Sequence, residues 1–396
     1  MRNVLTLLLV LLATVTTRAA EADSTRHVIH RLELEGAPGT ILHTNHFLKG
    51  ENYEKRTMNH ANTLKLKYAF MPPPGSAEAL TYKGVYQGLG LAKHDFNPQL
   101  GNPLSVFLFQ GATIKTLAPR LALNYEWNLG LAMGWRPYDR ETNRDNHVIG
   151  SHVTAYINAD FYLKYQLLPQ LAVNAGIGVT HFSNGNTAMP NAGLNTLNAK
   201  IGVAYLLGNV NGQEHGSIGE KTCKSADNRE RRWQTDVLLY GAWKCKGVDT
   251  DEGAYAIPGR YGVVGMNVTP MRRLNPWLRL GGSLDAVYDH SANIELSDYV
   301  LQFNYWNGDD NDMTMPAWYR QVAVGLSARV EFTMPYFAIN FGVGHQVVNA
   351  HGDFNGLYEI LALKIALTRH SFVHIGYSLF DYRYPNNLML GLGCRL

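Results

Sequence analysis

The feature that most constrains the fold is a long stretch in which apolar residues alternate with polar or small ones. It runs from Leu121 to Trp135 and reads L-A-L-N-Y-E-W-N-L-G-L-A-M-G-W. A period of two over this length predicts a long β-strand with one apolar face. The segment from His152 to Leu167 repeats the pattern, with Asp160 and Lys164 on its polar face. Both strands exceed the roughly 5–6 residues typical of soluble sheets.

Long alternating strands are typical of transmembrane β-barrels, which turn the apolar face to lipid and fill the lumen with polar groups. Short connections at 117–120, 167–170, 333–336 and 368–371 alternate with long polar ones such as 136–147. Aromatic residues at strand ends fit the interfacial girdles of such barrels; they are Trp135, Tyr138, Tyr165, Tyr336 and Tyr384. A soluble sandwich would have shorter strands. We therefore predict an all-β protein, a transmembrane antiparallel β-barrel of about 12–16 strands.

The N-terminus predicts export. Arg2 is followed by an apolar run from Val4 to Val15 and by small residues at Ala19 and Ala20, the pattern of a secretory signal peptide. We expect residues 1–20 to be this signal and residues 21–396 to form one outer-membrane barrel. One segment fits poorly: residues 209–231 are long and polar where a short turn is expected. The last strand, L-M-L-G-L-G-C-R-L, resembles the C-terminal assembly signal of bacterial outer-membrane proteins.

Charge and cysteine content narrow the function. A formal net charge of +3 is too small to suggest nucleic-acid binding. Three cysteines are too few for a disulfide framework, and whether Cys223 pairs with Cys245 stays open. No phosphate-binding loop, zinc motif or G-x-S-x-G elbow is present, so we expect neither a cofactor nor a metal.

Polar side chains interrupt one predicted lipid-facing stripe. The strand from Leu171 carries Val173, Ala175, Ile177 and Val179 on one face, and that face continues through His181 and Ser183. On the next strand the apolar face begins at Asn195. Polar groups facing lipid are costly, although the cost falls near the interface, where a histidine and a serine can simply lie at the wet rim. Three converging groups favour a function instead.

These three residue types suit nucleophilic catalysis. A serine hydroxyl needs a base to remove its proton, and His181 lies two residues away on the same face as Ser183. Asn195 can orient the imidazole by accepting its N–H, but it cannot offset the charge of the imidazolium. Asn184 and Gly185, in the turn that follows, are candidates for stabilising the oxyanion.

The motif H-F-S-N-G followed by P-N-A-G-L-N resembles the outer-membrane lipid A 3-O-deacylases, the acyloxyacyl hydrolase-like proteins. The resemblance implies that His181 is the base, Ser183 the nucleophile and Asn184 an oxyanion contributor. It also implies a lipid A or lipopolysaccharide substrate in the outer leaflet of a Gram-negative outer membrane. The family has an acidic residue twelve positions past the serine, where this sequence has Asn195.

Three alternatives stay open. Outer-membrane phospholipase A also has H-x-S-N-G and a Ser-His-Asn triad, so the substitution at Asn195 does not imply a dead enzyme. A lumen with Glu126, Asp160, Lys164 and Asn198 also fits a non-catalytic porin-like or structural barrel. A homodimer is a further possibility. The resemblance covers nothing after residue 208, and the deacylase barrel has only eight strands, so the role of residues 209–396 is unexplained.

Overall fold

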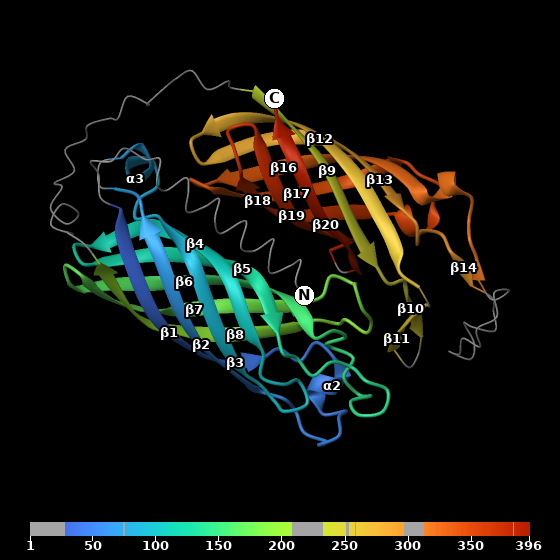
Figure 1. The fold of residues 1–396 in the computed structure, drawn as a ribbon, viewed down its shortest axis with the longest axis horizontal. Helices are drawn as coiled ribbons and strands as arrows, with labels where there is room; N and C mark the ends of the chain where they lie inside the picture. The colour runs from blue at the N-terminus through green and yellow to red at the C-terminus, as the bar shows by residue number, and fades with distance from the viewer. Residues whose placement is uncertain are drawn as a thin grey trace. The chain divides into compact units, whose positions relative to one another are not determined.

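The protein is described from a computed structural model, which covers residues 28–73, 76–207, 233–250, 253–257, 259–296, 313–382 and 384–396. The chain divides into two compact units, each built around one closed β-barrel (Figure 1). The segment predicted to be a signal peptide lies outside the described residues. Among those that are described, no helix is long and apolar enough to cross a membrane.

The first barrel consists of eight antiparallel strands that follow each other around the barrel in chain order and close between β1 and β8. Two short helices lie in its connections, α2 (His46–Lys49) and α3 (Ala77–Thr81). The strands are β1 (Ile29–Ile41), β2 (His60–Met71), β3 (Tyr86–Asp95), β4 (Leu104–Ala118), β5 (Leu121–Met133), β6 (Val153–Leu168), β7 (Leu171–Ser183) and β8 (Leu194–Leu207).

The second barrel also has eight antiparallel strands and closes between β9 and β20. They are β9 (Trp233–Lys244), β12 (Tyr261–Asn275), β13 (Leu278–Asp289), β16 (Val322–Thr333), β17 (Phe337–Val348), β18 (Leu357–Ala366), β19 (Ser371–Phe380) and β20 (Tyr384–Arg395). Its connections include two small two-stranded sheets, β10 (Gly247–Thr250) with β11 (Gly253–Ala256) and β14 (Glu295–Leu296) with β15 (Met313–Thr314), and two 3₁₀ turns, η2 (Trp318–Gln321) and η3 (Gly352–Phe354).

The predicted all-β antiparallel barrel class is confirmed. The two barrels hold sixteen strands within the described residues, but these strands form two closed barrels of eight rather than one barrel over 21–396. The long polar segment at 209–231, which did not fit a single barrel, falls between β8 and β9 and so joins one barrel to the next along the chain. It lies outside the described residues.

The alternation along the strands separates an apolar outer surface from a polar interior. Outward-facing Ile177 on β7 and Leu239 on β9 are 64% and 62% exposed, as expected for side chains that would contact lipid. The predicted inward positions Glu126, Asp160 and Asn198 are buried. In both barrels, tight turns such as 119–120, 169–170 and 276–277 at one end alternate with long loops at the other, and the connection between β2 and β3, which carries α3, is the longer exception. In an outer-membrane barrel the long loops lie outside the cell.

Buried ion pairs fill the interior of the first barrel. Lys200 Nζ lies 2.6 Å from Glu35, 3.1 Å from Glu126 and 3.3 Å from Asp160. Lys67 Nζ lies 2.5 Å from Glu35 and 2.8 Å from Glu126. Buried charges are tolerated only when they are paired in this way. The interior is therefore a packed polar core, which argues against the porin-like alternative.

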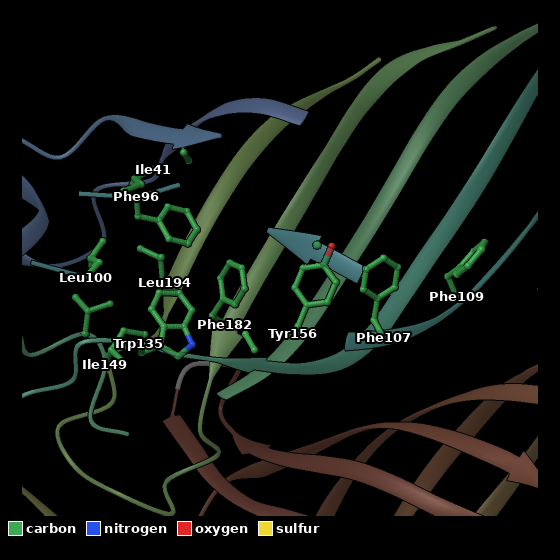
Figure 2. Close-up of a cluster of buried hydrophobic side chains, with 14 of the residues drawn as sticks. Ile41, Phe96, Leu100, Phe107, Phe109, Trp135, Ile149, Tyr156, Phe182 and Leu194 are labelled. Carbon is green, nitrogen blue, oxygen red and sulfur yellow. The ribbon is translucent and has the colours of Figure 1, made fainter. Parts of the chain in front are cut away.

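The long loops of the first barrel share an apolar core with inward-facing residues of its strands, among them Phe107, Tyr156 and Phe182 (Figure 2). Phe182 is fully buried there, and its ring centroid lies 5.0 Å from that of Trp135 and 5.8 Å from that of Phe96. The placement of Trp135 corrects the prediction that it belongs to the interfacial girdle. Strand β5 ends at Met133, and Gly134 with φ of +94° turns the chain inward, so Trp135 packs under the loops and donates its indole N–H to Thr154.

Candidate active site

Strands β7 and β8 bring His181 and Asn195 directly opposite each other. Side chains at such paired positions lie on the same face with their Cβ atoms about 4.5–5.5 Å apart. The flanking residues Phe182 and Leu194 are fully buried, so His181 and Asn195 lie on the outward face of the barrel. The His181 Nδ1 atom lies 2.7 Å from Asn195 Oδ1. The predicted contact between the two residues is present.

This hydrogen bond determines the chemistry of the imidazole. The amide oxygen of Asn195 can only accept, so His181 Nδ1 carries the proton and donates it. In the neutral ring the lone pair then lies on Nε2, which is the nitrogen that can take a proton from a hydroxyl. The arrangement is that of a general base with an orienting partner.

Ser183 is the last residue of β7 and follows His181 on the same face. It lies opposite Ala155 of β6 and is half-buried. Two strand residues advance by about 6.6 Å, so the serine lies nearer the outer end of the barrel than the histidine does. Both side chains therefore lie at the border between the apolar outer surface and the loops.

The loop after Ser183 has a defined internal structure. The Asn184 backbone N–H donates to Asn191 Oδ1 at 3.1 Å, and Asn184 Nδ2 donates to the Ala188 carbonyl at 2.8 Å. Gly185 and Asn186 both have positive φ, of +65° and +62°, a conformation that glycine and asparagine adopt most readily. Asn191 thus organises this turn, a role that the sequence signalled only through the P-N-A-G element.

A second group of chemistry-bearing residues lies in the lumen of the first barrel. Carboxylate oxygens of Glu35, Glu126 and Asp160 lie within 4.8 Å of one another, a spacing that could hold a metal ion. The ammonium groups of Lys67 and Lys200 already lie among these carboxylates. The cluster is therefore explained as an ion-pair core. Cys223, whose pairing with Cys245 the sequence left open, lies outside the described residues.

Two family models match the chain. The model described as lipid A 3-O-deacylase matches residues 77–204, and the model described as acyloxyacyl hydrolase, C-terminal domain, matches residues 233–396. Together they cover about three quarters of the chain, and the first includes His181, Ser183 and Asn195.

The chain belongs to the lipid A 3-O-deacylase family.

Members of this family are outer-membrane ester hydrolases that act on lipid A, and the same activity and location hold for this chain. The two matches lie on either side of the segment between β8 and β9. The first covers β3 to β8 of the first barrel, with β1 and β2 outside the match, and the second covers the whole of the second barrel. The C-terminal half, which the sequence motif left unexplained, is thereby placed in the family as well.

Other comparisons add little. A search of curated proteins returned no match. Among solved structures, Neisserial surface protein A is 9% identical, with 44% of this chain and 96% of that chain covered and a TM-score of 0.30. The Acinetobacter baumannii outer membrane protein Omp33 is 8% identical, with 93% and 98% covered and a TM-score of 0.16. The assignment to the family therefore depends on the two sequence models.

Proposed function

We propose that Ser183, His181 and Asn195 are the residues with which this lipid A deacylase cleaves its ester. The observation that carries the proposal is the 2.7 Å contact between His181 Nδ1 and Asn195 Oδ1 on the outward face, with Ser183 next on the same stripe. Polar groups on a lipid-facing surface are costly and need a reason to be there. A nucleophile, a base and an orienting group that lie next to one another on this face supply that reason.

The reaction follows from these positions. His181 Nε2 takes the Ser183 hydroxyl proton as Oγ attacks the ester carbonyl of the lipid, forming a tetrahedral intermediate. When the carbonyl reforms, the bond to the sugar oxygen breaks, and His181 returns the proton to that oxygen. Water then hydrolyses the acyl-enzyme by the same route, which releases the fatty acid and restores Ser183.

Asn195 limits this machinery in a specific way. It orients the ring and keeps the proton on Nδ1, as the acidic residue of the family would, but it does not stabilise the imidazolium that forms in the transition state. A carboxylate is not essential for a base in this position, because the tautomer is already set by the amide oxygen. We expect the chain to be active, and slower than a relative with an acidic residue.

The turn after the nucleophile is the proposed oxyanion site, with Asn184 and Gly185 as contributors. The Asn184 backbone N–H already donates to Asn191 Oδ1, and its side-chain amide donates to the Ala188 carbonyl. Asn184 therefore also holds the shape of the turn, and a substitution there would affect both roles. The lipid-facing position suits a substrate that diffuses in the outer leaflet, because its ester arrives from the side. Association of two chains into a homodimer stays a prediction.

The test is mass spectrometry of lipid A from cells that express the wild type or Ser183→Ala. We expect wild type to remove one ester-linked acyl chain and Ser183→Ala to leave it in place, because no acyl-enzyme can form. Ser378→Ala, on the inward face of β19, is the matched control and should behave as wild type. Unchanged lipid A with accumulating lysophospholipid would instead identify a phospholipase A, the activity that the Ser-His-Asn set also fits.

A further inference from the structure

The backbone approaches the His181 imidazole closely at one residue, Gly193. Its φ is +74°, in the left-handed region that glycine favours. A Cβ atom built at this position would lie 3.0 Å from His181 Cε1 and 3.2 Å from the Phe182 carbonyl oxygen. The backbone angle is therefore strained for a residue with a side chain, and its Cβ would lie closer to the imidazole than ordinary van der Waals contact.

Gly193 and Asn195 hold two different sides of the same ring. Asn195 Oδ1 accepts the hydrogen bond at Nδ1, while the Gly193 backbone lies beside Cε1, with Nε2 only 3.8 Å from the position of the missing Cβ. A hydrogen bond at one atom still permits the ring to tilt around it. A Cβ at Gly193 would press on Cε1 and tilt the ring in this way, so the absence of a side chain there preserves the direction in which the Nε2 lone pair points.

Gly193 is itself held by the loop between β5 and β6. Its N–H donates to the Val148 carbonyl at 3.1 Å, and the Ala192 N–H donates to the His147 carbonyl at 3.2 Å. The carbonyls are fixed in turn by Asn146, which is fully buried. Its Oδ1 accepts from the N–H groups of Val148 and Ile149, and its Nδ2 donates to the Arg136 carbonyl.

Apolar packing makes this support rigid. Val148, Ile149 and Leu194 are all fully buried in the apolar core of the outer loops, where Figure 2 shows Ile149 and Leu194. Close-packed interiors transmit a displacement rather than absorb it. A disturbance in residues 146–149 therefore reaches Gly193 and the histidine beside it.

We propose that Gly193, held in place by residues 146–149, is a positioning residue for the His181 base. The inference rests on the proposed role of His181 in deacylation. Gly193 is not among the proposed reacting groups, and it acts by leaving room for the imidazole in the orientation that Asn195 holds. A misplacement of about 1 Å in a catalytic group can cost on the order of 100-fold in rate.

The first experiment measures kcat and KM of purified protein on lipid A in detergent. Gly193→Ala should lower kcat by about 10- to 100-fold and leave KM within about 2-fold, because only the base is moved. The matched control is Gly50→Ala, at φ of +121°, where the new Cβ would come no closer than 3.5 Å to any neighbour. Equal kcat in the two variants would overturn the proposal.

Asn146→Ala covers the case in which Gly193→Ala does not fold. It leaves Gly193 in place but removes the side chain that fixes the Val148 carbonyl, so kcat should fall by several-fold at unchanged KM. Wild-type kcat in Asn146→Ala would show that the loop does not support the base.

A thermodynamic cycle tests the contact without any activity measurement. The midpoint of heat-induced unfolding is compared for wild type, Gly193→Ala, His181→Ala and the double variant. Gly193→Ala should lower the midpoint less in the His181→Ala background, because the ring it would strike is absent. Additive shifts would contradict the contact. If wild type and His181→Ala deacylate lipid A equally, the proposed function is wrong. If His181→Ala is inactive but Gly193→Ala is fully active, only the positioning role of Gly193 is wrong.

Discussion

The two barrels of this chain share one architecture and differ in what they present to lipid. In the first, the β7–β8 pair places His181 against Asn195 on the outward face. In the second, the corresponding last pair, β19–β20, places apolar side chains opposite each other on this face, Val373 with Leu392 and Ile375 with Leu390. An outward-facing histidine does occur in the second barrel, His345 on β17, but its cross-strand neighbours are Leu326 and Leu357.

The interiors differ much less. Lys364 lies 2.9 Å from Asp236 and 2.6 Å from Glu331 in the second barrel, as Lys200 lies among carboxylates in the first. Both lumens are thus closed by buried ion pairs. The comparison teaches that buried ion pairs are part of how both barrels are built. Polar groups that converge on the outer face occur in one barrel and need a separate explanation. By this criterion we place the proposed catalytic site in the first barrel.

The sharpest way to break this comparison is to remove the outward-facing histidine from each barrel in turn. His181→Ala should lower deacylation at least 10³-fold, because the serine then has no base. His345→Ala should leave the rate unchanged. Both rates are measured by mass spectrometry of lipid A, with folding checked by the shift in gel mobility on heating. Loss of activity in His345→Ala would show that the second barrel takes part in catalysis.

The similarity of the two interiors is tested by stability. Lys200→Ala should destabilise the protein by about 3–5 kcal/mol, because only Lys65 and Lys67 then remain among the three buried carboxylates of Glu35, Glu126 and Asp160. Lys364→Ala should cost less, since Arg279 still lies 2.5 Å from Glu331 and Arg395 2.9 Å from Asp236. Denaturant unfolding in detergent measures both. An equal loss in the two variants would mean that the remaining arginines do not compensate.

The smallest effect concerns the residue that departs from the family pattern. Asn195→Ala should lower kcat by about 10- to 100-fold, since the imidazole loses its orienting acceptor but keeps its basicity. Asn195→Asp, which retains an oxygen acceptor, should recover most of the rate or exceed it. Wild-type activity in Asn195→Ala would mean that the hydrogen bond at His181 Nδ1 has no role in catalysis. It would then no longer distinguish the outward face of the first barrel from that of the second.

Much of the fold and the outline of the site follow from the sequence. The alternation between Leu121 and Trp135 predicts β5, and the same rule places His181 and Ser183 on the outward face, as the structure has them. These predictions succeed because the direction of a strand side chain depends only on its position along the chain. The strand number follows only as a range of about 12–16, and the structure has sixteen barrel strands within the described residues.

The tertiary structure alone decides where the barrels close. Sixteen alternating strands fit one barrel or two equally well, and the choice depends on pairing between residues far apart, such as Leu34 with Val203 in the first barrel. The pairing of buried charges is equally beyond the sequence. The inward direction of Glu126 is predictable, but its partner Lys67 comes from another strand. The place of Gly193 beside His181 likewise depends on a loop that begins some fifty residues earlier in the chain. Local patterns determine which way a side chain faces, and long-range packing determines what it meets there.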